Sequence, residues 1–208
     1  MGMVVVVANA PLRWTERLVR RLRGATLVVA ADGGANHLAR IGVRPAAVVG
    51  DLDSIRPEVR AWVGEDRVVS RPDQDFTDLH KTLAYVIDEL GAKTVVIVGG
   101  TGGRIDHAIE NLALLARWAG RAELEMHDES VRIIPVRHEA AFTVAIGATV
   151  SLLPLGRCER VWTAGLRWPL DGEPLDLGGR TSVSNQATEE RITVRVAGGT
   201  LLVFLPSG

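Results

Sequence analysis

Residues 94–118 have the sequence TVVIVGGTGGRIDHAIENLALLARW. The stretch opens with an uninterrupted apolar run, continues through four glycines and closes with a helical pattern. A strand that is covered on both faces is uniformly apolar in this way, and strand, loop and helix in succession form the repeating unit of a parallel α/β sheet. The segment therefore predicts a strand at 94–98, a glycine-rich loop, and a helix at 105–118.

The same alternation extends over residues 1 to about 120. In residues 77–90, apolar side chains recur at spacings of three and four, which makes one apolar helix face. The other expected strands in this half are 4–8, 26–31, 46–49 and 67–69. The expected helices are 11–22, 35–40, 57–63, 77–90 and 105–118.

The helical period disappears from about residue 121. Short segments separated by glycine, proline and Asp-Gly turns are typical of an antiparallel β-sandwich or barrel. The expected strands are 123–126, 131–136, 142–145, 149–153, 160–163, 192–196 and 200–205. We therefore expect an α/β fold in two parts, an N-terminal parallel-sheet domain at 1–120 and a C-terminal antiparallel β-sandwich domain at 121–208.

The overall composition excludes several classes of protein. Lys and Arg number 24 against 25 Asp and Glu, a net charge of −1, which leaves no basic excess for nucleic acid or anionic lipid. The single Cys158 excludes an intramolecular disulfide framework and a cysteine-based zinc site. No apolar run is long enough for a membrane span, and the first residues, MGMVVVVANAP, lack the features of a signal peptide. We expect a cytoplasmic protein.

Six aspartates in the first half follow an apolar strand or stand at the start of a helix. In an open parallel sheet, ligands bind outside the carboxyl ends of the strands, and carboxylates gathered there repel one another unless a cation or protons intervene. Mg²⁺ prefers such oxygen ligands together with substrate phosphates. The alternative is helix capping, which suits any one of them better than all six at once. They are Asp32, Asp51, Asp53, Asp75, Asp78 and Asp106.

Two of the motifs that hold these aspartates follow strands directly. In ADGGAN (residues 31–36), two glycines allow a close approach of the backbone to a ligand, or simply a tight turn. In GDLDS (residues 50–54), Asp51 and Asp53 are two residues apart, so in an extended segment both face the same side. This spacing suits a two-carboxylate metal site better than an Asx turn.

Two further motifs open helices. In DQDFTDLHK (residues 73–81), Asp75 or Thr77 can cap the helix, and Asp78 and Lys81 share a face, as a metal and phosphate pair or as a surface ion pair. In GGTGGRIDH (residues 99–107), exposed backbone amides and a helix N-terminus favour anions, and Arg104 can bind a phosphate. Neither GxxxxGK[ST] nor GxGxxG is present.

These four motifs, in this order, resemble the thiamine pyrophosphokinase (thiamine diphosphokinase) family. The resemblance extends to the β-rich half through GLRWPL (residues 165–170) and SVSNQ (residues 182–186). It implies a Mg²⁺-dependent transfer of the terminal diphosphate of ATP to the hydroxyethyl group of thiamine, giving thiamine diphosphate and AMP. It also implies a homodimer whose active site lies at the subunit interface, with ATP and Mg²⁺ bound by residues 1–120 and thiamine by residues 121–208.

The resemblance assigns roles to individual residues. The implied metal ligands are Asp51, Asp53 and Asp78. Asp32 would lie beside them, and the implied phosphate and reacting-hydroxyl side comprises Thr77, Lys81, Gly102, Gly103, Arg104 and Asp106. The implied thiamine side comprises Gln74, Ser184, Asn185 and Trp168, the last either as a stacking surface or as a core residue.

Three points stay open at the level of sequence. Asp75, Asp78 and Asp106 are all candidates for the base that accepts the alcohol proton, although positioning can matter more than deprotonation in such reactions. A related diphosphotransferase acting on another small alcohol, such as a pterin, is one alternative function. A nucleotide- or thiamine-binding sensor is another.

Overall fold

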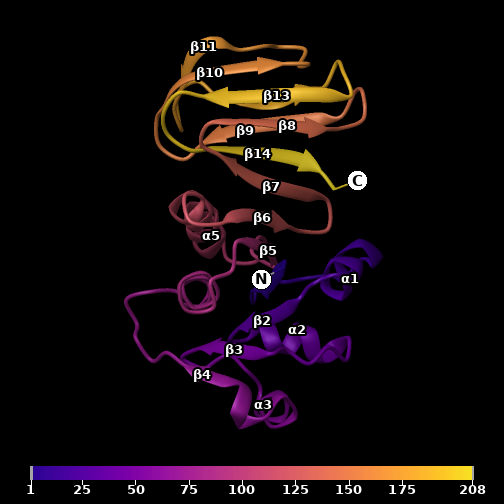
Figure 1. The fold of residues 1–208 in the computed structure, drawn as a ribbon, viewed down its shortest axis with the longest axis vertical. Coiled ribbons are helices and arrows are strands. Elements are labelled where there is room, and N and C mark those ends of the chain that lie inside the picture. Colours follow the sequence, from indigo (N-terminus) through magenta and orange to yellow (C-terminus); the bar gives the residue numbers. More distant parts are fainter. Residues whose placement is uncertain (1, 208) are drawn as a thin grey trace. The chain divides into compact units, whose positions relative to one another are not determined.

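The computed structural model describes residues 2–207, which form two compact units (Figure 1). The first unit comprises the residues up to Leu114 together with Arg121–Glu129, and the second comprises Leu115–Gly120 together with the residues from Ser130 onward. The expected fold class, a parallel α/β part followed by an antiparallel β-rich part, is confirmed. None of the helices in the described range is long and apolar enough to cross a bilayer.

The first unit contains a sheet of six strands in the order β6-β5-β1-β2-β3-β4, with every neighbouring pair parallel. Its central strand β1 is fully buried along its whole length, as the uninterrupted valine run predicts. The strands are β1 (Val4–Val7), β2 (Leu27–Ala31), β3 (Ala47–Gly50), β4 (Val68–Ser70), β5 (Thr94–Val98) and β6 (Glu123–His127).

The order of these strands reverses between β1 and β5. From β1 the chain proceeds outward through β2, β3 and β4, and then returns to the other side of β1 as β5 and β6. In open α/β sheets a ligand crevice forms at such a reversal, outside the carboxyl ends of the two strands. The segments that follow β1 and β5 are therefore expected to line a ligand crevice.

Helices connect the parallel strands. They are α1 (Glu16–Arg23), α2 (Gly34–Arg40), α3 (Pro57–Val63), α4 (Asp78–Ala84) and α5 (Ile105–Trp118), with a short 3₁₀ turn η1 (Glu65–Arg67) and a π-helical segment η2 (Tyr85–Glu89). The helices expected at 57–63 and 105–118 are confirmed to the residue. The one expected at 77–90 is present as α4 followed by η2.

Two expectations for the first unit are wrong in detail. The helix expected from residue 11 begins only at Glu16, because the side chain of Thr15 accepts a hydrogen bond from the amide of Leu18 and caps it there. The strand expected at 123–126 in the antiparallel half is β6, which pairs in parallel with β5. Helix α5 connects β5 to β6 as a crossover, so the parallel sheet extends one strand further than the loss of helical period indicates.

The second unit contains two antiparallel sheets of four strands, in the orders β12-β9-β14-β7 and β11-β10-β13-β8. Side chains from both sheets share one buried apolar cluster, which includes Leu152, Val161 and Val203, as in a β-sandwich. The strands are β7 (Val131–Val136), β8 (Glu139–Thr143), β9 (Thr149–Pro154), β10 (Cys158–Ala164), β11 (Asp171–Leu175), β12 (Ser182–Gln186), β13 (Arg191–Val196) and β14 (Leu201–Pro206).

Strands β11 and β12 are absent from the expected set. β11 has the sequence DGEPL and β12 has SVSNQ, neither of which carries the β-branched and aromatic enrichment of a typical strand. Each is the terminal strand of its sheet in the described order, paired on one side only. Edge strands tolerate proline and polar residues, so tertiary pairing rather than local propensity makes these strands.

Candidate active site

A cleft of about 800 Å³ opens at the carboxyl edge of the parallel sheet. The segments that line it are residues 8–11 after β1, residues 74–79 at the start of α4 and residues 102–104 before α5. Asp51, Asp53 and Ser54, which follow β3, also line it. All of these segments belong to the first unit, and two of them follow β1 and β5, the pair at which the strand order reverses.

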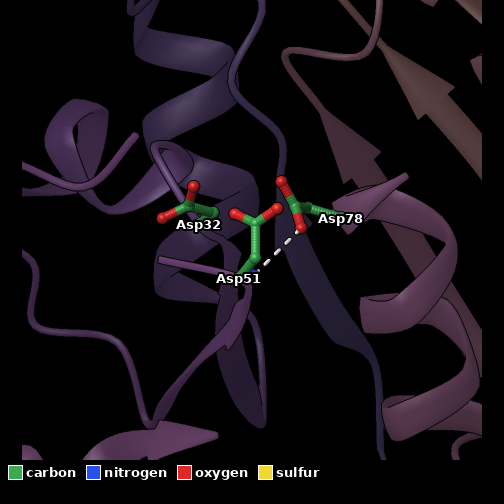
Figure 2. A group of neighbouring side chains, drawn as sticks. All are labelled: Asp32, Asp51 and Asp78. Carbon is green, nitrogen blue, oxygen red and sulfur yellow. Dashed lines mark hydrogen bonds between the residues drawn. The ribbon is translucent and has the colours of Figure 1, made fainter. Parts of the chain in front are cut away.

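Three aspartates from different elements meet at this edge. Asp32 follows β2, Asp51 follows β3, and Asp78 is the first residue of α4. Each offers one carboxylate oxygen, and the three oxygens lie within 4.8 Å of one another. Figure 2 shows the side chain of Asp51 between those of Asp32 and Asp78, whose Oδ1 also accepts the backbone amide of Asp51 at 3.3 Å.

Asp32 is the most buried of the three, with 1% of its surface exposed. Its two carboxylate oxygens accept the backbone amides of Ser54 at 2.8 Å and Ile55 at 3.0 Å, which ties the segment after β2 to the segment after β3. Burial is the largest cause of a raised pKa at Asp32, and the negative charge of Asp78 acts in the same direction; against the effect of the two hydrogen bonds, they bring the pKa to about 6. The ionised form of Asp32 therefore favours a nearby cation.

The GDLDS motif presents its two aspartates differently. Leu52 adopts a left-handed conformation with φ +71°, and Asp51 Oδ1 accepts the amide of Asp53 at 3.3 Å. The side chain of Asp51 joins the three-carboxylate cluster, whereas Asp53 Oδ1 accepts the hydroxyl of Ser54 at 2.8 Å and Asp53 is outside that cluster. Asp53 still lines the cleft.

Gln74 lies against Asp51. Its Nε2 donates to Asp51 Oδ2 at 2.8 Å, and this hydrogen bond lowers the pKa of Asp51 below its ordinary value. The side-chain amide of Gln74 is thus hydrogen-bonded to a carboxylate of the cluster. Gln74 also lines the cleft, so its amide carbonyl can face a ligand there.

Lys81 supplies a positive charge beside the cluster. Its Nζ lies 3.3 Å from Asp78 Oδ1 and 3.9 Å from Asp51 Oδ2, and only 6% of its side chain is exposed. It is absent from the lining of the cleft. Lys81 therefore neutralises two of the carboxylates from within the protein. It does not form the exposed surface ion pair that the sequence left open as an alternative.

The start of α4 is fixed by local hydrogen bonds. Thr77 is the N-cap residue, and its Oγ1 accepts the amide of His80 at 3.4 Å. The amide of Asp75 donates to the side chain of Asp73 at 2.8 Å in the preceding turn. Of the two capping candidates, Thr77 is therefore the cap, and Asp75 lines the cleft with the exposed Phe76.

A side chain at residue 50 would not fit beside the cluster. Gly50 has φ +158°, and a Cβ there would lie 2.8 Å from Cβ of Asp32 and 2.9 Å from Oδ1 of Asp78. Gly34, in the ADGGAN motif, is equally constrained, because its Cβ would lie 2.0 Å from the carbonyl oxygen of Val7. The glycines let the chain pass close enough for the aspartates to converge.

The glycine-rich loop lies between β5 and α5. Gly102 and Gly103 have φ values of +87° and +63°, and both line the cleft together with Arg104. The guanidinium of Arg104 binds both carboxylate oxygens of Asp106, with Nε at 3.1 Å from Oδ1 and Nη2 at 2.5 Å from Oδ2. The hydrogen bond from Arg104 lowers the pKa of Asp106 to about 2.

Trp168, Ser184 and Asn185 belong to the second unit. Asn185 is buried and exchanges hydrogen bonds with the backbone of Trp168, accepting from its amide at 3.2 Å and donating to its carbonyl at 2.7 Å. Trp168 itself is 57% exposed, and Cζ of Arg167 lies 5.1 Å from the centroid of its ring. Ser184 is exposed and left-handed, with φ +58°. Trp168 is therefore not a core residue.

Sequence reasoning missed several residues that line the cleft: Ala8, Asn9, Ala10, Pro11, Ala31, Ser54, Phe76, Leu79, His107 and Asn111. Asn9 and Pro11 could have been found, because they follow a buried strand at the same sheet edge as the aspartates. The contribution of Asn111, two turns into α5, depends on the direction of that helix.

The cluster has the chemistry of a site for a hard divalent cation. Oxygen ligands of Mg²⁺ at its short coordination distance stand about 3 to 4 Å apart, and the three carboxylate oxygens need only small side-chain movements to reach that spacing. The raised pKa of Asp32 and the three gathered negative charges, offset by one lysine, are the electrostatic sign of such a site. The donor set therefore fits Mg²⁺.

Comparison with known families finds two matches that together span most of the chain. Residues 18–126 match the family described as thiamin pyrophosphokinase, catalytic domain, and residues 132–201 match the one described as thiamin pyrophosphokinase, vitamin B1 binding domain. The order of the two matches is that of the two units.

Similar proteins carry the same name. Thiamine pyrophosphokinase 1 of Oryza sativa subsp. japonica is 32% identical, over 96% of this chain and 85% of its own length. Thiamine pyrophosphokinase 1 of Arabidopsis thaliana is 31% identical, over 91% and 81%. The crystal structure of thiamine pyrophosphokinase from Bacillus subtilis superposes with a TM-score of 0.86 over 99% of both chains at 24% identity, a likeness of fold.

Proposed function

Because the chain belongs to the thiamine pyrophosphokinase family, we propose that its cluster of Asp32, Asp51 and Asp78 holds the Mg²⁺ of an ATP-dependent diphosphate transfer. The chain is an enzyme of this family. It transfers the terminal diphosphate of ATP to the hydroxyethyl group of thiamine, and the products are thiamine diphosphate and AMP.

One observation carries the proposal about the site. Three carboxylates from three separate elements converge at the same sheet edge as a glycine-rich loop that precedes a helix. Carboxylates alone would repel a triphosphate, and a glycine-rich loop alone would bind many anions. A cation between the two resolves the repulsion, and it polarises phosphoryl oxygens when bound.

The residues of the chain divide the work of binding. Backbone amides around Gly102 and Gly103 and the guanidinium of Arg104 face the phosphates from one side of the cleft. Lys81 partly neutralises Asp51 and Asp78, which lowers the charge that the nucleotide meets. Asp53 lies next to the cluster and lines the cleft, where it serves as a further ligand through a water or after a side-chain rotation.

We propose Asp75 as the proton acceptor, on the basis of the surroundings of the three candidates. Asp106 is ion-paired with Arg104 and has a pKa of about 2, so it is a weak base. Asp78 belongs to the metal cluster. Asp75 lines the cleft outside that cluster, and we assign it the role of accepting the alcohol proton or orienting the hydroxyl group. Alignment of the alcohol with the β-phosphorus contributes more to the rate than the base does.

The second unit supplies the thiamine pocket in this proposal, in keeping with its match to a vitamin B1 binding domain. Trp168 would stack on the thiamine rings, and Ser184 and Asn185 would shape the pocket around it. Gln74 would contact the pyrimidine from the first unit. We further propose a homodimer in which the first unit of one subunit and the second unit of its partner form each active site.

The decisive assay is AMP formation from ATP and Mg²⁺ in the presence of thiamine, a pterin alcohol or no acceptor. We expect AMP with thiamine alone. AMP with the pterin alone would indicate the related diphosphotransferase, and thiamine binding without AMP would indicate a sensor; neither alternative is favoured by the family matches. Asp51→Asn should reduce turnover by orders of magnitude without altering the fold, and a fully active variant would remove Asp51 from the metal site.

The cytoplasmic location expected from the sequence is part of the same proposal. Fractionation of cells that express the full-length chain tests it, with thiamine diphosphokinase activity as the marker.

A further inference from the structure

The glycine-rich loop is held by hydrogen bonds to two side chains outside it, those of Asn111 and Asp128. Asn111 is buried in α5, and its Nδ2 donates to the carbonyl oxygen of Gly100 at 2.9 Å. The hydroxyl of Thr101, in the middle of the loop, donates to Asp128 Oδ2 at 3.0 Å. Asp128 directly follows β6, which pairs in parallel with β5.

Asp128 is in turn fixed by a partly buried hydrogen-bond network. Arg17 of α1 donates through Nη2 to the backbone oxygen of Asp128 at 2.6 Å, and its Nη1 lies 3.2 Å from Nδ1 of His127. A guanidinium can only donate, so Nδ1 of His127 accepts, and Nε2 carries the proton toward Glu125 Oε2 at 2.6 Å. His127 is fully buried, whereas Arg17, Glu125 and Asp128 are partly exposed.

The loop needs such support because of its composition. Gly99, Gly102 and Gly103 all have positive φ, and glycines lose more conformational freedom on ordering than other residues. A loop that must order when its ligand binds lowers the affinity, whereas a loop that is already ordered does not. The Thr101 hydroxyl links the middle of this loop to Asp128, whose backbone oxygen Arg17 of α1 also binds.

We propose that Asp128, acting through Thr101, is a positioning residue that orders the glycine-rich loop for the phosphates of ATP. This inference rests on the proposed function, which assigns the loop to phosphate. Asp128 touches no reacting atom in this account. Its contribution is to hold the amides of the loop in their binding geometry before the nucleotide arrives.

The test compares Thr101→Val, Thr101→Ser and Thr94→Val by steady-state kinetics with ATP and thiamine. Thr101→Val keeps the shape of the side chain and removes the hydroxyl, and we expect the KM for ATP to rise by about three- to tenfold, with a smaller change in kcat. Thr101→Ser retains the hydroxyl and should restore the wild-type KM. Thr94→Val is the matched control, since it removes a threonine–carboxylate contact, to Glu123, at the other end of the same strand pair.

A double-mutant cycle assigns the effect to the pair. Asp128→Ala should raise the KM for ATP as Thr101→Val does, and the double variant should be no worse than either single variant. Effects that multiply, an unchanged KM in Thr101→Val, or failure of Thr101→Ser to rescue would overturn the proposal. If Asp128→Ala does not fold, the Thr101 pair still decides.

Failure of the proposed function gives a different pattern. A wild-type protein that releases no AMP with thiamine would remove the substrate assignment and this inference with it. A wild-type protein that is active, together with an unaffected Thr101→Val variant, would overturn only the role of Asp128. Thermal unfolding of each variant separates a loss of positioning from a general loss of stability, which would lower the midpoint and contradict the proposal.

Discussion

The ammonium group of Lys81 lies 3.3 Å from Oδ1 of Asp78, three residues before it on α4, and the lysine side chain is only 6% exposed. A buried lysine that is ion-paired with two of the three clustered carboxylates is the internal counterpart of the cation that the site is proposed to bind. The positive charge of Lys81 offsets part of the electrostatic repulsion that holding Asp32, Asp51 and Asp78 so near one another causes.

We therefore expect Lys81→Met to destabilise the metal-free protein by about 2 kcal/mol, because the substitution leaves the partly buried carboxylates of Asp51 and Asp78 without their partner. Saturating Mg²⁺ should recover part of this loss. Denaturant unfolding in EDTA and in Mg²⁺ measures both quantities. Lys93→Met, at an exposed lysine, is the control, and equal losses in the two variants would show that Lys81 is not coupled to the cluster.

Gly50→Ala should cost at least tenfold in turnover, because the added Cβ would push against Asp78 and Asp32. Gly42→Ala is the control. Gly42 also has positive φ, +66°, but a Cβ there meets nothing within 4 Å, so that variant should lose about 1 kcal/mol of stability and keep its activity. Comparable activities in the two variants would argue against close packing around Gly50 as a requirement of the site.

The raised pKa of Asp32 predicts a pH dependence with a definite sign. Its pKa is about 6 in the folded protein against an ordinary value of 3.8, so the folded state binds the additional proton between these values. The contribution of Asp32 to stability is then fully present below about pH 4 and lost as the pH rises through 6. In EDTA, the stability of the wild type relative to Asp32→Asn should fall between about pH 4 and pH 6.5. A difference that rises or stays flat would contradict the shift.

The shared-site homodimer predicts complementation between inactive subunits. Asp51→Asn removes a residue of the first unit, and Trp168→Ala removes one of the second. Unfolding and remixing the two inactive proteins should recover about a quarter of wild-type activity, because half of the dimers are mixed and each mixed dimer has one intact site. Recovery of no activity, with dimers present by sedimentation, would indicate that each site is formed within one subunit.

Much of the first unit follows from periodicity. Strand β1 is four consecutive valines, and α5 carries its apolar residues at helical spacing, so α5 is predictable with its bounds and β1 to within one residue. The extra parallel strand β6 is not, because ELEMH alternates like a half-exposed strand, and only the crossover through α5 makes it parallel. Strand β12, SVSNQ, forms through pairing with β9 rather than through its own propensity.

The candidate site is likewise only partly predictable from the sequence. Position after a strand indicates Asp32 and Asp51, and helix-start position indicates Asp78, but their mutual distances depend on how β2, β3 and α4 pack. Sequence spacing alone favours Asp53 as the partner of Asp51. The left-handed Leu52 turns the chain between them, and Asp32 joins the cluster in place of Asp53. A positive φ at a leucine is a property of the folded loop that no spacing rule contains.

The most direct test of the metal site is a crystal of the protein grown with Mn²⁺ and a non-hydrolysable ATP analogue, measured at the manganese absorption edge. The account predicts an anomalous peak about 2.2 Å from carboxylate oxygens of Asp51 and Asp78, with Asp32 coordinating directly or through water, and with nucleotide phosphates on the same ion. An ion bound to the nucleotide elsewhere in the cleft, with the three aspartates contacting neither, would contradict it.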